Sequence, residues 1–402
     1  MVILPSSFLV GIFNYKREKR SRKNMLKKIL LWGFIFAFTF SCQKPMIQNF
    51  ISPENPIITA NQNFSRTGFQ DFIIKDSLKL ISNEDILGLP FSSFLKYSGE
   101  LIFTTHNGYL YFVSLNDFDD QRKISIADGI LSAPSIQGKT LFLAISKGEY
   151  GLIAYDITSA ETKWTINGKF SQSSPVLTNN HVIHATLNGQ ILAYNLLDGT
   201  IAWQVELNDA IKNNLSKFGN TLVAAGQNGK INSYDIESGF LNWSNSLNDA
   251  VYASPVLTKE FVYIATYSGS IVKISRHDGE IIKRFEANVE QYQSPVIDNE
   301  NIYIALADGK LVSLDKATLQ EKWRIQLNGP FSSTPLLGTK ELLVGTESRK
   351  FYRINKLNGE IIQMLNLDGR PRIQPVFYDN KIYLAYGPDY LEVYSTNGEI
   401  DE

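Results

Sequence analysis

Cysteine and histidine are both scarce in this chain. Cys42 is the single cysteine among 402 residues, which excludes a disulfide within the chain. Of the four histidines, His181 and His184 lie three apart in an expected strand, so their side chains point to opposite faces and cannot share a metal. A phosphate-binding glycine loop, a paired zinc motif and a nucleophile with a base at a recognisable spacing are also missing. We therefore predict no catalytic residue, no metal site and no cofactor.

An apolar run long enough to cross a membrane is absent as well. The run over residues 29–40 has 12 residues, whereas a transmembrane helix needs about 20. It follows Lys27 and Lys28 and precedes Ser41 and Cys42, which is the layout of a signal peptide. We predict a signal peptide over residues 1–41, with Met25 as the true start. A basic n-region that extends upstream of Met25 is the alternative.

Cys42 stands where a mature chain would begin. A lone cysteine after Ser41 is similar to the lipobox of bacterial lipoproteins, from which Thr39 and Phe40 depart. We predict that Cys42 is lipidated; an ordinary secretory signal followed by a buried free thiol is the alternative. Residues 42–75 show no sustained periodicity and contain prolines at 45, 53 and 56, so they are predicted to form a flexible tether.

The chain has no excess of positive charge. Residues 1–41 hold eight of the 39 basic and one of the 40 acidic residues, so the remainder carries 31 and 39 and a net charge of −8. Nucleic-acid binding depends on neutralising phosphates with Lys and Arg. An acidic mature chain without a basic stripe therefore predicts no nucleic-acid partner.

What the chain does have is a repeat of about 40 residues, present eight times from Phe91 to the C-terminus. Two columns of residues keep the same spacing of 40 or 41. The small-residue column is Thr104, Ala144, Ala185, Ala225, Ala265, Ala305, Gly345 and Ala385. The second column is Phe94, Pro134, Pro175, Leu215, Pro255, Pro295, Pro335 and Pro375.

Each repeat predicts one sheet of four strands. In residues 174–207, four apolar runs are separated by Asn179-Asn180, Asn188-Gly189 and Asp198-Gly199, dipeptides that form tight hairpins. Eight such sheets can bury their faces only by packing radially against one another. Small residues suit the strands that converge on the axis. Large rings in the last strand, at Trp164, Trp203, Trp243 and Trp323, are expected to fill the gaps between adjacent sheets.

The last repeat stops one strand short. Residues 374–402 contain three strand-like runs, and residues 76–82 alternate like a strand with no repeat of their own. We predict that this N-terminal strand completes the last sheet and leaves no open edge. The predicted fold is all-β: an eight-bladed β-propeller of four-stranded antiparallel blades over residues 76–402.

One turn interrupts the repeat with positive charge. Where other repeats have Asn-Gly or Asp-Gly, the seventh has Arg349, followed by Lys350 and Arg353. A cation on an acidic body could meet an acidic partner, so these three residues are the predicted partner-binding site. A solvated turn is the alternative. Extra residues at 147–151 mark a second irregular loop.

The repeat resembles the pyrroloquinoline-quinone-type propeller family. The resemblance rests on SPVL at 174–177 with YNLLDGTIAW at 194–203, and on NLSKF at 214–218 with YDIESGFLNW at 234–243. Together with the lipobox-like start, it is similar to the lipoprotein of the outer-membrane β-barrel assembly machinery. The resemblance implies a lipid-anchored envelope scaffold that binds a protein partner, with that machinery as the candidate partner. Gln43 after the cysteine favours sorting to the outer membrane.

The family leaves two other functions open. One is an extracytoplasmic ligand-binding or sensor propeller; the other is a quinoprotein dehydrogenase-like enzyme. Such dehydrogenases hold their quinone with a vicinal disulfide and a Ca²⁺ ion bound by Glu, Asn and Asp, and this chain cannot make the disulfide. Its Asp156, Asn195, Asp235, Asp315 and Asn355 share one repeat position, which favours hydrogen bonding within turns. We therefore predict a protein that is not an enzyme.

Overall fold

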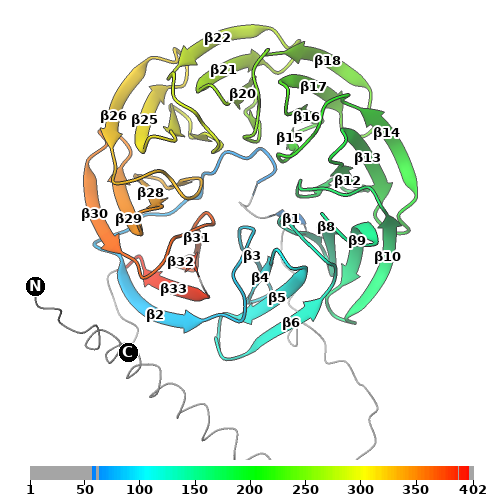
Figure 1. The fold of residues 1–402 in the computed structure, drawn as a ribbon, viewed down its shortest axis with the longest axis horizontal. Helices are drawn as coiled ribbons and strands as arrows, with labels where there is room; N and C mark the ends of the chain where they lie inside the picture. The colour runs from blue at the N-terminus through cyan, green and yellow to red at the C-terminus, as the bar shows by residue number, and fades with distance from the viewer. Residues whose placement is uncertain (1–56, 60–62, 388, 398–402) are drawn as a thin grey trace, which may run out of the picture. The chain divides into compact units, whose positions relative to one another are not determined.

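The computed structural model describes residues 57–59, 63–387 and 389–397. These residues form eight antiparallel sheets around a central axis, and no helix (Figure 1). The predicted eight-bladed propeller is confirmed. The predicted signal peptide and Cys42 lie outside the described residues. Within the described part of the chain, no helix has the length and apolarity needed to cross a membrane.

The blades follow one another in chain order, each from its innermost to its outermost strand. Blades 1 and 2 are β3 (Leu95–Tyr97), β4 (Glu100–Thr104), β5 (Tyr109–Ser114) and β6 (Gln121–Ser125), then β7 (Ser135–Gln137), β8 (Thr140–Ala144), β9 (Tyr150–Asp156) and β10 (Glu161–Asn167). Blades 3 and 4 are β11 (Val176–Leu177), β12 (His181–Ala185), β13 (Gln190–Asn195) and β14 (Ile201–Glu206), then β15 (Ser216–Phe218), β16 (Thr221–Ala225), β17 (Lys230–Asp235) and β18 (Leu241–Ser246). Blades 5 and 6 are β19 (Val256–Leu257), β20 (Phe261–Ala265), β21 (Ser270–Ser275) and β22 (Ile281–Glu286), then β23 (Val296–Ile297), β24 (Asn301–Ala305), β25 (Lys310–Asp315) and β26 (Glu321–Gln326). Blade 7 is β27 (Leu336–Leu337), β28 (Glu341–Thr346), β29 (Lys350–Asn355) and β30 (Ile361–Asn366). Blade 8 is β31 (Val376–Tyr378), β32 (Lys381–Tyr386), β33 (Tyr390–Ser395) and β2 (Lys79–Asp85).

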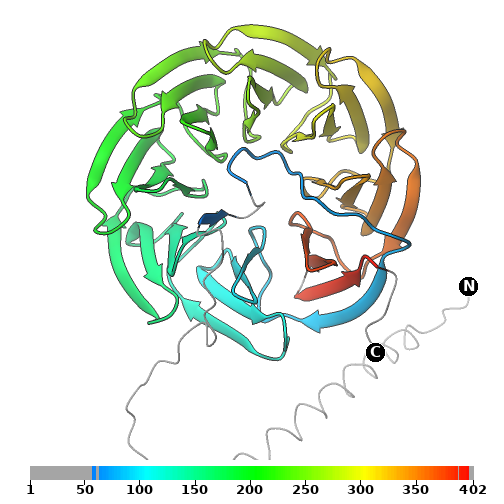
Figure 2. The ribbon, with the colours of Figure 1, turned by 180° about the vertical axis from the view of Figure 1, so that it is seen from behind.

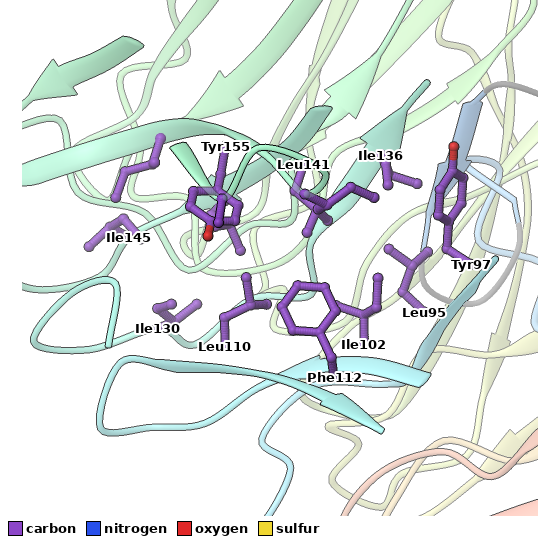
Figure 3. Close-up of a cluster of buried hydrophobic side chains, with 14 residues drawn as sticks. Leu95, Tyr97, Ile102, Leu110, Phe112, Ile130, Ile136, Leu141, Ile145 and Tyr155 are labelled. Carbon is purple, nitrogen blue, oxygen red and sulfur yellow. The ribbon is translucent and has the colours of Figure 1, made fainter. Parts of the chain in front are cut away.

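The core lies between the blades. Figure 3 shows one interface, where Ile102 and Phe112 of blade 1 face Ile136 and Leu141 of blade 2. All four are at most 1% exposed, and burying each such side chain contributes about 1.5–3 kcal/mol. The small-residue column is buried in every blade. At Gly345 a Cβ atom would lie 2.5 Å from the Pro371 ring, so even an alanine would not fit at this position of the column without a shift.

The last blade closes as expected. β2, from the N-terminal part of the chain, pairs antiparallel with β33 along residues 79–85 and 390–395. The strand is three residues further along the chain than the predicted 76–82. Blade 8 therefore takes its outermost strand from one end of the chain and its other three from the other end (Figure 1).

The segment before β2 differs from the predicted tether over residues 42–75. Residues 57–59 form β1 (Ile57–Thr59), which pairs antiparallel with β7 of blade 2. Residues 63–78, hereafter the strap, cross one face of the ring from near the central axis to the rim (Figure 2). The last residues of three innermost strands donate backbone N–H groups to it: Leu257 to Ser65 O (2.9 Å), Ile297 to Thr67 O (2.9 Å) and Leu337 to Gly68 O (3.1 Å).

Apolar side chains fix the outer half of the strap between blades 7 and 8. Phe72, Ile74 and Leu78 are at most 4% exposed and pack in the cluster of those two blades. Gln363 occupies the β30 position that holds Trp in β26, and it bonds both the N–H (2.9 Å) and the carbonyl oxygen (3.1 Å) of Leu78. The strap accepts hydrogen bonds from the backbone N–H groups of three innermost strands, and it fills the interface between blades 7 and 8, where β30 carries no tryptophan. The propeller thus begins well before residue 76.

Candidate functional site

The antiparallel blades give the ring two unlike faces. The turns between the first and second strands, and between the third and fourth, lie on the face crossed by the strap, hereafter the strap face. The turns between the second and third strands and the connections between blades lie on the opposite face, hereafter the loop face. Loops on a rigid scaffold are where propellers can vary without disturbing the core.

Two of the three predicted partner-binding residues lie on the loop face. Arg349 is exposed in the turn between β28 and β29. Its φ of 58° is left-handed, as is the 89° of Gly229 at the same position in blade 4. Lys350 is partly exposed and donates to the side chain of Asn366. The turn thus keeps the repeat's backbone conformation while presenting a cation.

Arg353 is buried and cannot form a surface site with Arg349 and Lys350. It is 6% exposed, between the strands of blade 7 and the strap. Its guanidinium forms an ion pair with Glu341 of β28 and donates to the carbonyl oxygens of Ile74 (3.0 Å) and Asp76 in the strap. Its position is therefore structural: the charge is paired within the blade and the remaining donors hold the strap.

Titratable groups elsewhere serve the fold. His184 is fully buried, its Nε2 lies 2.6 Å from the carbonyl oxygen of Lys169, and burial lowers its pKa to about 4. The acids at the shared repeat position bond within turns, as predicted: the Ser238 hydroxyl and the backbone N–H groups of Ser238 and Glu237 lower the pKa of Asp235. No cluster of three or more His, Cys, Asp or Glu residues that could hold a metal occurs among the described residues.

The loop face also carries an aromatic group, the tyrosine cluster: Tyr252, Tyr267 and Tyr292. The three residues come from the connection between blades 4 and 5, the β20–β21 turn, and the connection between blades 5 and 6. Ring centroids lie 5.5 Å apart for Tyr252–Tyr267 and Tyr267–Tyr292, both edge to face, and 6.2 Å apart for Tyr252–Tyr292. Tyr252 is 37% and Tyr292 50% exposed.

One carboxylate joins two of the three tyrosines. The Tyr267 hydroxyl donates to one oxygen of Glu290 at 2.7 Å, and the Tyr292 hydroxyl donates to the other at 3.0 Å. Hydrogen bonding with Tyr292 and with Glu290 raises the pKa of Tyr267, so this phenol stays protonated. The result is a preformed aromatic surface with a negative charge at its edge, suited to contacts with the apolar and cationic groups of another protein.

Sequence reasoning missed the tyrosine cluster. Tyr252 and Tyr292 occupy one repeat position, which is Lys212 in the preceding repeat and Ser332 in the following one. Comparing the position three residues before the proline column across the repeats would have identified these two tyrosines. Only the structure shows that Tyr267 and Glu290 meet them.

The sequence of this chain matches a known protein family. A family model described as outer membrane protein assembly factor BamB matches residues 118–318 and 294–399. A search of curated protein sequences gave no match.

Solved structures share the fold at low sequence identity. The crystal structure of BamB from Moraxella catarrhalis matches with a TM-score of 0.66 and 16% identity, over 79% of this chain and all of that one. A computationally designed protein, Ika8, matches with a TM-score of 0.69 and 13% identity, over 79% and 100%. Quinohemoprotein alcohol dehydrogenase from Comamonas testosteroni matches with a TM-score of 0.70 and 11% identity, over 87% and 82%. At such identities the likeness shows the fold alone.

Proposed function

The chain belongs to the family of the outer membrane protein assembly factor BamB, and from that membership we propose that it is a lipid-anchored scaffold of the bacterial cell envelope that binds a protein partner. The outer-membrane β-barrel assembly machinery is the first candidate for that partner. The outer membrane is the proposed location, and the lipid on Cys42 is the proposed anchor.

The tyrosine cluster is the observation that carries the protein-binding role. Tyrosine is enriched at the centres of protein interfaces because its ring provides a large contact area with little rotamer entropy to lose. Here the rings are already held by Glu290 and by one another. Arg349 and Lys350, two blades away on the same face, extend the proposed docking surface with positive charge.

Site-specific crosslinking tests this role. A photoreactive phenylalanine analogue at Tyr292 should crosslink in living cells to a component of the barrel-assembly machinery, identified by mass spectrometry. The same analogue at Leu197, 92% exposed on the strap face, is the matched control and should not give that product. Absence of any machinery component among the Tyr292 products, with the protein folded and abundant, would contradict the proposal.

The anchor is tested separately. Labelled palmitate should enter the wild-type protein, and Cys42→Ala should abolish the label and release the protein from membranes. The 14 residues between Cys42 and β1 can span at most about 50 Å. The anchor therefore keeps blade 2 within that distance of the membrane. Membrane retention of Cys42→Ala would contradict the anchor while leaving the docking role standing.

A binding role also separates this chain from the dehydrogenases that share its fold. With Cys42 as its single cysteine, the chain cannot form the vicinal disulfide expected of such enzymes. We expect calorimetry to detect no binding of pyrroloquinoline quinone in the presence of Ca²⁺. A tight one-to-one complex would favour the enzyme.

A further inference from the structure

The strap face contains a large groove that the proposed docking role does not use. It has a volume of about 1160 Å³ and lies between the strap and the turns of blades 5 to 7. On one side it is bounded by Ser65, Thr67 and Phe69 of the strap, and on the other by residues 257–261, 297–301 and 315–317. Figure 2 shows this face and the course of the strap across it.

Ammonium groups in the groove are held largely by neutral oxygens. Lys273 is 5% exposed, and its Nζ donates to the carbonyl oxygens of Lys316 (3.2 Å) and Ala317 (3.0 Å) while lying 4.1 Å from the ring centre of Phe261. Lys316 donates to the carbonyl oxygen of Asp298 at 2.7 Å. Because these acceptors are uncharged, neither ammonium is neutralised by them. Burial lowers the pKa of both lysines and outweighs the opposite effect of nearby carboxylates, which are Asp315 and Glu260 for Lys273 and Asp298 and Glu300 for Lys316.

The other charges on the lining are of both signs. Lys356 pairs with Asp298 at 2.8 Å, and Lys322 donates to the side-chain oxygen of Asn301 at 2.8 Å. Glu260, Glu300 and Asp315 also line the groove, as does Lys259. The whole lining therefore holds five lysines and four carboxylates, together with the aromatic rings of Phe69, Phe218 and Phe261.

The strap shows what kind of molecule this face of the ring accommodates. It is an extended chain that receives a backbone hydrogen bond from blade after blade, at Leu257, Ile297 and Leu337. Leu257 and Ile297 also line the groove. Alternate strap residues face it, including the hydroxyl-bearing Ser65 and Thr67. The groove therefore continues a surface already suited to an extended polypeptide.

We propose that this groove binds an extended segment of a partner protein, with a carboxylate of that segment placed on the ammonium groups of Lys273 and Lys316 and an apolar side chain against Phe261. This site is distinct from the loop face and does not depend on the tyrosine cluster. A charge-assisted hydrogen bond between carboxylate and ammonium fixes the segment in the partly enclosed site, while backbone and apolar contacts provide the remaining affinity.

Two synthetic peptides test the proposal by calorimetry on the full chain in a neutral detergent. One alternates Phe and Glu over ten residues; the other has Gln in place of Glu. We expect the Glu peptide to bind at least about tenfold more tightly, which corresponds to 1.4 kcal/mol. Lys273→Met with Lys316→Met should abolish that preference. Lys212→Met, an exposed lysine on the loop face, is the matched control and should retain it.

Each other outcome overturns the proposal. Equal affinity for the two peptides, no binding by either, or a preference that survives in the double variant would exclude a carboxylate-binding groove. Displacement of the Glu peptide by phosphatidylglycerol vesicles, but not by neutral vesicles, would assign the groove to an anionic lipid instead. If the double variant fails to fold by circular dichroism, Lys316→Met alone, at a partly exposed position, is measured by the same criterion.

Discussion

Trp243 of blade 4 donates its indole N–H to the carbonyl oxygen of Arg276 in blade 5, at 2.8 Å. The same ring covers Gly279 in the turn that follows β21, so closely that a Cβ there would lie 2.7 Å from it. Trp164 and Trp323 make the corresponding bonds to Leu196 and Lys356 of the next blades, both at 3.1 Å. A tryptophan and a turn glycine thus join successive blades.

This contact predicts a large cost for Gly279→Ala. The residue has φ +78°, and its Cβ would also collide with the indole, so we expect a loss of about 2–4 kcal/mol in the free energy of unfolding, measured with urea. Gly99→Ala is the matched control: Gly99 has φ +76° and nothing within 4 Å of a Cβ. It should lose only about 1–2 kcal/mol. Equal losses would mean that the indole contact contributes nothing.

Arg353 is predicted to matter for stability and not for partner binding. Arg353→Leu leaves the Glu341 carboxylate buried without its cation, so we expect a loss of about 3–5 kcal/mol in thermal or urea unfolding. Arg353→Leu with Glu341→Leu removes both charges and should recover much of that loss. A residual deficit in the double variant would measure the bonds from Arg353 to the strap.

The repeat made the fold predictable, and features outside the repeat made the rest unpredictable. Blade number, turn positions and the need for a closing strand all follow from the two columns spaced by about 40 residues. The strap has no repeat, and its hydrogen bonds to the blades are accepted by the backbone carbonyl oxygens of Ser65, Thr67 and Gly68, which any residue carries. Arg353 looked like a surface cation because its buried partner Glu341 lies in the neighbouring strand, 12 residues away in sequence.

His184 predicts a pH dependence of stability. Burial lowers its pKa to about 4 in the folded protein, against about 6.5 when unfolded. Below pH 6.5 the unfolded chain binds a proton that the folded chain does not, so stability falls as the pH decreases toward 4. The contribution is about 2 kcal/mol between pH 7 and pH 5. His184→Gln should remove that difference in the free energy of unfolding, measured by urea denaturation at pH 7 and at pH 5.

The last prediction concerns the cations of the loop face. Arg349→Glu with Lys350→Glu reverses two charges at the turn between β28 and β29 without touching the core, because Arg349 is exposed and the partly exposed Lys350 side chain donates to Asn366 of the neighbouring strand β30. The melting temperature should stay within about 2 °C of wild type, since exposed charges contribute little to stability. If the docking surface extends from the tyrosine cluster to this turn, reversing the charges repels an acidic partner and lowers the yield of the Tyr292 crosslink at least about threefold. A crosslink of undiminished yield in the folded variant would confine the docking surface to blades 4 to 6, and Arg349 would then be a solvated turn residue.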